Sequence, residues 1–213
     1  MKPVKIYCIY ILILGIILLS NKVQGQTIVH DSSEGFISRP MTEIELSNYR
    51  QSIWDNLPAA VGWVNDFGEL FKNEEENALE SLIEHFEKKT GIEIMLVTVD
   101  TNMVARDKLK DFSERLLTMW GIGKIRRKNG IVICICKGYE AIEISSGFGI
   151  DKFMNHDQKL QILQTSFIPY YQKNSFYEGT LTGLKTLISQ LSGENYSNNV
   201  VKYRYNVIQK LFK

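Results

Sequence analysis

The spacing of apolar residues predicts alternating helices and strands between residues 42 and 192. Apolar residues recur at helical spacing in several segments, each bounded by residues that typically begin or end helices. The predicted helices are 42–57, 73–90, 106–120, 155–168 and 175–192. Two continuous apolar runs, 92–99 and 130–136, are typical of strands covered on both faces, and 141–145 is predicted as a further strand.

Residues that cap helices set several of the predicted boundaries. Capping boxes predict four helix starts, and the pairs are Thr42 with Glu45, Asn73 with Glu76, Asn155 with Gln158, and Ser175 with Glu178. Gly91 predicts the end of the helix at 73–90, because glycine readily adopts the left-handed backbone that closes a helix. The helix that begins near Asn155 is expected to end before Pro169, since proline interrupts a helix.

The order of these elements predicts the sheet. A helix connects strands 92–99 and 130–136, so the two strands should lie parallel. The next connection, 137–140, is too short for a crossover, so strand 141–145 must return antiparallel. We therefore predict the α/β class: a three-layer α/β/α sandwich with a small mixed β-sheet, in which parallel core strands are joined by an antiparallel hairpin.

A series of short motifs occurs in a fixed order along this region. In chain order they are Val64-Asn65-Asp66, Thr90-Gly91, Trp120-Gly-Ile-Gly, Asn129-Gly130, the run 131–136, Ser146-Gly-Phe-Gly-Ile-Asp, Tyr177-Glu-Gly and Gly183. This ordered set resembles the TPM domain family over residues 60–192. The resemblance implies an extracytoplasmic α/β domain with divalent-metal binding, and a phosphatase activity in some members.

The first 25 residues have the layout of a secretory signal peptide. Lys2 and Lys5 precede an apolar run from Ile6 to Leu19, and the small residue Gly25 follows a short polar step. The run has 14 residues, fewer than the roughly 20 that span a bilayer, which favours a cleaved leader over an uncleaved anchor. We expect cleavage after Gly25 and an exported chain, either periplasmic or secreted.

Composition divides the remainder of the chain. Its parts are a linker and N-terminal helix at 26–58, the TPM-like domain at 59–192, and a polar linker with a basic amphipathic tail at 193–213. Apolar residues of the tail recur near helical spacing, which indicates a helix that contacts an anionic membrane surface or a partner, or that packs on its own domain. The alternation of Val201, Tyr203 and Tyr205 leaves a strand as the other interpretation.

The net charge argues against a nucleic-acid-binding domain, and the cysteine spacing argues against a disulfide-bonded or redox-active protein. The formal charge of +1 becomes about −2 when Lys2, Lys5 and Lys22 leave with the leader, which is unlike a nucleic-acid-binding domain. Cys134 and Cys136 lie two residues apart in one predicted strand and point to the same face, a geometry that suits a disulfide badly. We interpret them as small buried hydrophobic residues rather than as redox or metal-binding groups.

Two acidic residues are predicted to meet at one edge of the sheet. Asp100 ends its strand, and Asp66 lies in the loop before a helix that must start at that same edge. Carboxylates are preferred ligands of calcium and magnesium, and Asn65, Thr101 and Asn102 offer further oxygen atoms. Asp66 and Asp100 are therefore candidate metal ligands; the alternative is that each caps a nearby backbone turn.

A second candidate site lies at the opposite edge. The loop at Asn129 and the loop from Ser145 to Asp151 should lie together there, because they flank two antiparallel strands. Gly147 and Gly149 can adopt positive φ and expose backbone N–H groups, so an anion or a neighbouring loop could dock there. A purely conformational turn is the simpler alternative. The basic segment 124–128 would attract phosphate or an acidic partner.

Catalytic groups are scarce in the sequence. The histidines beyond the leader are His30, His85 and His156, and they form no evident acid–base pair. We therefore predict a non-enzymatic exported accessory domain that binds calcium or magnesium and an envelope protein partner. The alternative is a metal-dependent phosphatase in which a cation held by Asp66 and Asp100 activates water.

Overall fold

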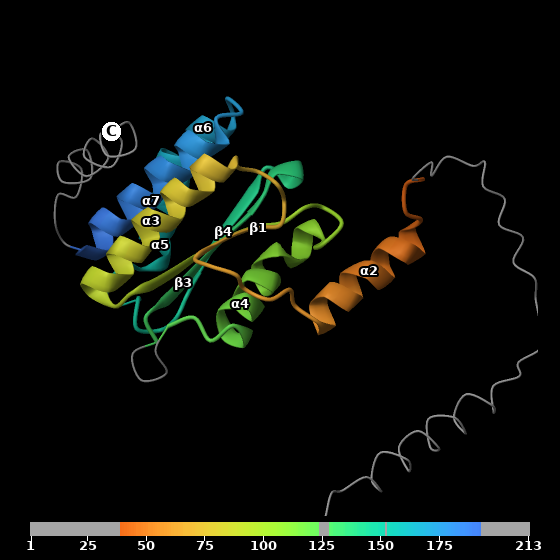
Figure 1. Ribbon diagram of the computed structural model, residues 1–213, viewed down its shortest axis with the longest axis horizontal. Coiled ribbons are helices and arrows are strands. Elements are labelled where there is room, and N and C mark those ends of the chain that lie inside the picture. Colours follow the sequence, from red (N-terminus) through yellow and green to blue (C-terminus); the bar gives the residue numbers. More distant parts are fainter. Residues whose placement is uncertain (1–38, 124–127, 152, 193–213) are drawn as a thin grey trace, which may run out of the picture. The chain divides into compact units, whose positions relative to one another are not determined.

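The computed structural model describes residues 39–123, 128–151 and 153–192. One four-stranded sheet lies at the centre of the domain, in the order β1-β2-β3-β4 (Figure 1). The strands are β1 (Val64–Asp66), β2 (Glu93–Thr98), β3 (Gly130–Cys136) and β4 (Ala141–Ser146). β1, β2 and β3 run parallel and β4 is antiparallel to β3, so the predicted mixed sheet is confirmed.

Helices cover both faces of the sheet. They are α2 (Glu43–Asp55), α3 (Asn73–Thr90), α4 (Leu109–Met119), α5 (His156–Ile162), α6 (Ile168–Tyr171) and α7 (Phe176–Ser192). The core on one face includes residues of α3, α5, α6 and α7, and the core on the other includes residues of α4 with α2 packed beside it. The three-layer arrangement is therefore also confirmed. No described helix is both long enough and apolar enough to cross a lipid bilayer.

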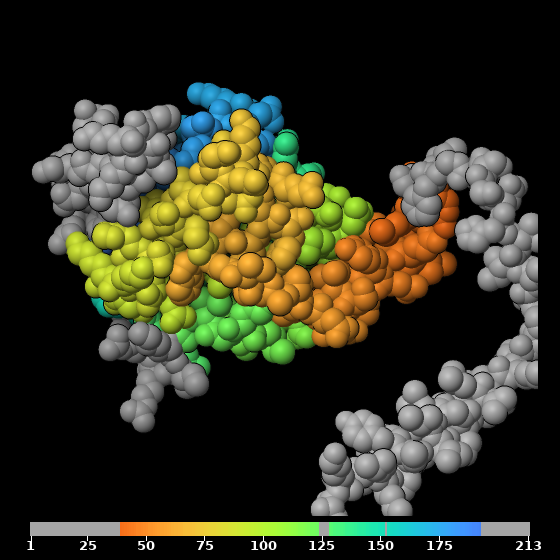
Figure 2. All heavy atoms as spheres, in the orientation of Figure 1, coloured from red at the N-terminus to blue at the C-terminus, as the bar shows by residue number. Residues whose placement is uncertain are grey.

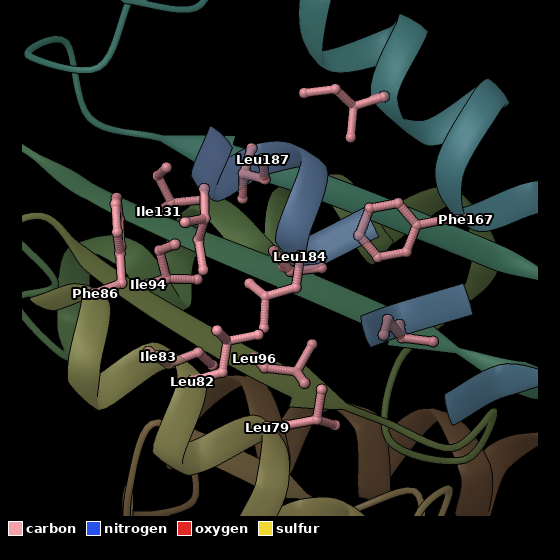
Figure 3. Close-up of a cluster of buried hydrophobic side chains, with 14 of the residues drawn as sticks. Leu79, Leu82, Ile83, Phe86, Ile94, Leu96, Ile131, Phe167, Leu184 and Leu187 are labelled. Carbon is pink, nitrogen blue, oxygen red and sulfur yellow. The ribbon is translucent and has the colours of Figure 1, made fainter. Parts of the chain in front are cut away.

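The two central strands contribute to both cores, because successive side chains of a strand point to opposite faces. The side chains toward α3 and α7 are Ile94, Leu96, Ile131, Ile133 and Ile135, part of the cluster in Figure 3. The side chains toward α4 are Met95, Val97, Val132, Cys134 and Cys136. Burial on both faces explains why these strands are continuous apolar runs rather than alternating ones.

Cys134 and Cys136 are buried free thiols on the same face of β3. Burial raises the pKa of both thiols, so neither is poised to act as a thiolate. Their interpretation as small hydrophobic residues is confirmed.

Two of the four predicted capping boxes are present, those at Thr42 and Asn155, and the box at Ser175 stays a prediction. Glu45 N–H donates to Thr42 Oγ1 over 3.3 Å, and Gln158 N–H donates to Asn155 Oδ1 over 3.0 Å. The box predicted at Asn73 is wrong by one residue. The helix is capped at Lys72, whose N–H donates to Glu75 Oε2 over 2.9 Å. Asn73 is a better N-cap residue than Lys72, so the sequence favoured the wrong register, and the shift leaves Glu76 outside the cap.

The predicted helix end before Pro169 is also wrong. After α5 the chain continues through a π-helical segment, Leu163–Phe167, directly into α6, where Pro169 lies in the first turn. A first-turn proline costs no intrahelical hydrogen bond, because N–H groups there have no partner within the helix. The wider π turn accommodates the proline where an unbroken α-helix would not.

Gly183 lets α7 approach the π segment closely. A Cβ atom at this position would lie 2.0 Å from the Phe167 ring, and Phe167 itself is fully buried. The ring therefore has no free space into which it could move. Close packing of α7 on this side of the sheet requires a residue without a side chain at position 183.

Gly183→Ala is expected to lower the free energy of unfolding by about 1–3 kcal/mol through overpacking. In an unobstructed helix interior the same change is stabilising by about 1 kcal/mol, so the sign of the effect is decisive. Urea unfolding measures it. Gln190→Ala, at an exposed position of the same helix, is the control and should change stability by less than about 0.5 kcal/mol. A stabilised Gly183→Ala variant would contradict the close contact.

Candidate functional site

The carboxyl ends of the parallel strands gather several polar groups at one edge of the sheet. Asp66 is the last residue of β1 and is paired in register with Thr98, the last residue of β2. α3 begins at Asn73, only a short turn beyond Asp66. Open α/β sheets usually bind ligands at such an edge. The structure therefore places Asp66 and the start of α3 where the sequence predicted them.

The Asp66 carboxylate organises the turn that follows it. Leu70 N–H donates to Oδ1 over 3.0 Å, and Phe71 N–H donates to Oδ2 over 2.8 Å. The Thr98 hydroxyl donates to Oδ1, and Thr98 Oγ1 in turn accepts the Gly68 N–H over 2.9 Å. One side chain thus closes the turn at 66–71 and anchors it to β2.

Asp100 has a similar role in the loop after β2. Its Oδ1 accepts the N–H groups of Asn102 and Met103 over 2.6 and 2.9 Å, which is the geometry of an Asx turn. The predicted oxygen donor Asn65 is also occupied, since its amide bonds Val61 N–H and Gly62 O. Of the two alternatives for Asp66 and Asp100, this geometry favours capping.

Glu76 is an acidic residue whose carboxyl group is affected by the charge of Asp66. It lies in the first turn of α3 and is half-buried. Burial raises the pKa of its carboxyl group, and the negative charge of Asp66 raises it further. The sequence pattern does not indicate this pair, because Asn73 with Glu76 has the spacing of a capping box. The signal that could have revealed it is the run of three glutamates, of which only one can close a capping box.

A second group missed in the sequence is Arg50 of α2. Its Nη2 donates to Thr101 O over 2.7 Å and to the Tyr139 hydroxyl over 3.1 Å, and so ties α2 to the loop after β2. Trp54 packs against the same side of the domain. α2 has no fully buried residue and projects from the body of the domain (Figure 2), and a groove of about 490 Å³ lies between it and residues 103–112.

The opposite edge brings together the second set of candidates. Gly147 N–H donates to Gly130 O, and Gly149 N–H donates to Lys128 O, each over 2.9 Å. The loops at 128–130 and 145–151 are therefore neighbours, as predicted. Asp151 Oδ1 lies 3.4 Å from Lys159 Nζ.

Asn129 is buried, and its side-chain amide donates to Gly91 O. Each of these N–H donors already has an acceptor within the fold. The geometry favours the conformational-turn interpretation over an anion site.

Gly147 and Gly149 do not use the positive φ that glycine allows. Among the described glycines, positive φ occurs at Gly91, Gly121 and Gly123. Gly147 is required for a different reason, since a Cβ atom there would lie 2.3 Å from Lys128 O. The contact between two main chains, rather than an unusual backbone angle, explains the glycine. Residues 124–127, most of the predicted basic segment, lie outside the described residues.

Comparisons with known proteins identify relatives of this fold. A family model described as the TPM domain matches residues 64–190. The chain is similar to the solution structure of the N-terminal domain of a protein from P. gingivalis, with a TM-score of 0.57 and 21% identity, covering 62% of this chain and 82% of that one. It is also similar to the NMR structure of the BA42 protein from the psychrophilic bacterium Bizionia argentinensis, with a TM-score of 0.51 and 18% identity, covering 59% and 83%.

At these identities the solved structures show the fold alone. No protein of curated function matches the chain. α2 precedes the matched segment, so Arg50 and the α2 side of the groove lie outside the family match, whereas the opposite side, residues 103–112, lies within it.

Asp66→Asn is expected to lower the free energy of unfolding by about 2–3 kcal/mol, because either orientation of the new amide places its NH₂ group against a main-chain N–H. Asp100→Asn should cost less than about 1 kcal/mol, because one amide oxygen can still accept both N–H groups of the Asx turn. Urea unfolding of the two variants provides the comparison. Equal losses would contradict the distinct roles assigned to the two carboxylates.

Proposed function

This chain belongs to the TPM domain family, and on that basis we propose that it is an exported, non-enzymatic accessory domain. It binds one divalent cation, calcium or magnesium, at the carboxyl edge of the sheet and acts through an envelope protein partner. Support for export comes from the signal-peptide layout of residues 1–25, which lie outside the described residues.

Two neighbouring carboxyl groups carry the cation proposal. Burial raises the pKa of the Glu76 carboxyl group and the charge of Asp66 raises it further, so the two groups repel each other when both are ionised. Neither of them forms an ion pair with a described lysine or arginine. A divalent cation beside both would replace one repulsion with two attractions.

The ligand set would be small and partly hydrated. No group of three or more His, Cys, Asp or Glu side chains that could hold a metal occurs within the described ranges. Asp66 already accepts three hydrogen bonds, so Glu76 supplies the freer oxygen atoms. Magnesium often binds through one or two carboxylates and keeps several waters, and calcium also accepts waters and carbonyl oxygens. Affinity should therefore be weak, with a Kd on the order of 10⁻⁴–10⁻³ M.

Cation binding would also change the surface offered to a partner. The first turn of α3 carries Glu74, Glu75 and Glu76, and Asp66 adds a further negative charge beside them. A bound divalent cation offsets two of these charges. The edge then becomes accessible to an acidic or apolar partner surface that the cation-free edge would repel.

Glu76→Gln is expected to weaken calcium binding by at least about tenfold, because it removes one of two charged ligands. Isothermal titration of the chain with calcium chloride, and separately with magnesium chloride, measures the effect. Glu74→Gln is the matched control, since this exposed residue lies in the same turn and the charge change is identical. Equal affinity in Glu76→Gln and in the unmodified chain would overturn the proposed site.

Phosphatase activity is not expected from these residues. His85 lies well inside α3, and His156 begins α5 near Glu143 of β4, so neither supplies an acid–base group beside Asp66. We expect no phosphate release from p-nitrophenyl phosphate above the buffer rate, with either calcium or magnesium present. Release that scales with protein concentration and disappears in Glu76→Gln would establish the phosphatase alternative instead.

A further inference from the structure

The two edges of the sheet are protected unequally. β1 is a three-residue edge strand, and the Glu80 carboxylate accepts the N–H groups of Trp63 and Val64 over 2.9 and 2.7 Å. β4 is the other edge strand and has six residues. No described strand pairs with its outer side. An open edge of this length is a template for one more strand.

The hydrogen-bond pattern shows which main-chain groups of β4 point outward. Gly147 N–H donates to Gly130 O, and in this register Ala141, Glu143 and Ser145 direct their main-chain groups toward β3. Ile142 and Ile144 therefore direct their N–H and C=O groups away from the sheet. No hydrogen bond to these groups occurs in the described part of the chain. An added strand would supply partners for both residues.

Glu143 specifies what such a strand should carry. It is half-buried at the edge, and burial raises the pKa of its carboxyl group. The charged groups around it are Lys110 and Glu114 of α4 and His156 of α5, but Lys110 forms its ion pair with Glu114. Glu143 has no ion pair within the described ranges. A basic side chain directly opposite it on a new strand would complete the edge.

The C-terminal tail has the matching sequence. Residues 201–205 read Val-Lys-Tyr-Arg-Tyr, in which apolar and basic side chains alternate with the period of a strand. We propose that this segment, which lies outside the described residues, adds to β4 as a fifth, antiparallel strand. The proposal is independent of the cation site, because β4 and β1 are at opposite edges of the sheet.

One register satisfies both faces of the added strand. Residues directly opposite each other in an antiparallel pair share a face, so placing Arg204 opposite Glu143 places Tyr203 opposite Ile144. Tyr205 then lies opposite Ile142. The two aromatic rings cover isoleucines that are only partly buried, and the guanidinium reaches the unpaired carboxylate. In this register Lys202 lies opposite Ser145.

The direction and reach of the chain fit this pairing. Lys137 Nζ lies 5.0 Å from the centre of the Phe176 ring, so α7 begins at the end of the sheet where β4 starts. α7 has 17 residues and is about 25 Å long, enough to reach the end where β4 finishes. The residues at 193–200 can then extend about 26 Å, so the tail enters at that end and runs antiparallel to β4.

Amide hydrogen exchange of the full chain, followed by NMR, tests the pairing directly. Ile142 and Ile144 N–H groups should exchange at least about tenfold more slowly than in a chain that ends at Asn199. Arg204→Glu should remove this protection, because it places like charges opposite each other. The double variant Glu143→Arg with Arg204→Glu should restore it. Lys210→Glu, a charge reversal in the tail outside the proposed strand, is the control and should leave it unchanged.

Several outcomes would overturn the proposal. Equal exchange of both amides in the full and shortened chains would show that the tail does not cover β4. Protection that depends on protein concentration would assign the strand to a second copy of the chain. Binding of the full chain to vesicles of anionic phospholipid, lost in the shortened chain and accompanied by no protection of Ile144, would identify the tail as a membrane-contacting segment instead.

Discussion

The Asp66 carboxylate is the interaction on which the carboxyl edge of this domain depends. It ends β1, holds the turn that leads to α3, and bonds the Thr98 hydroxyl at the end of β2. Neighbouring strands and the first helix of the domain are thereby fixed to one another by one charged group. Hydrogen bonds to a carboxylate are stronger than those between neutral groups, so this arrangement fixes the turn that leads into α3. Any ligand at this edge meets a site whose geometry Asp66 has already set.

Patterns that depend on local periodicity could be predicted from the sequence. The apolar runs of β2 and β3 predicted central strands, and both faces of each strand are buried. The short connection at 137–140 predicted the antiparallel return of β4, because no crossover fits that length. The order of motifs predicted the family, which the match over 64–190 confirms.

Features that depend on tertiary contacts could not be predicted in the same way. Asn73 with Glu76 is the better capping pair by sequence, and only the observed cap, Lys72 with Glu75, leaves Glu76 outside the cap and under the influence of the Asp66 charge. Pro169 predicts a helix end by its local chemistry, yet the preceding π segment carries the chain past it. From the sequence, Gly147 suggests a glycine needed for backbone freedom. In the structure it is needed because its main chain contacts Lys128 closely, and that contact depends on the pairing of β3 with β4.

We propose that Asp66 and Glu76 together form the cation site. The most direct measurement is a pH titration of the Glu76 carboxyl carbon by ¹³C NMR, with and without saturating calcium. Without calcium the pKa of Glu76 should lie above its ordinary value, and with calcium it should fall, because the cation stabilises the ionised form. A pKa that calcium leaves unchanged would contradict the account.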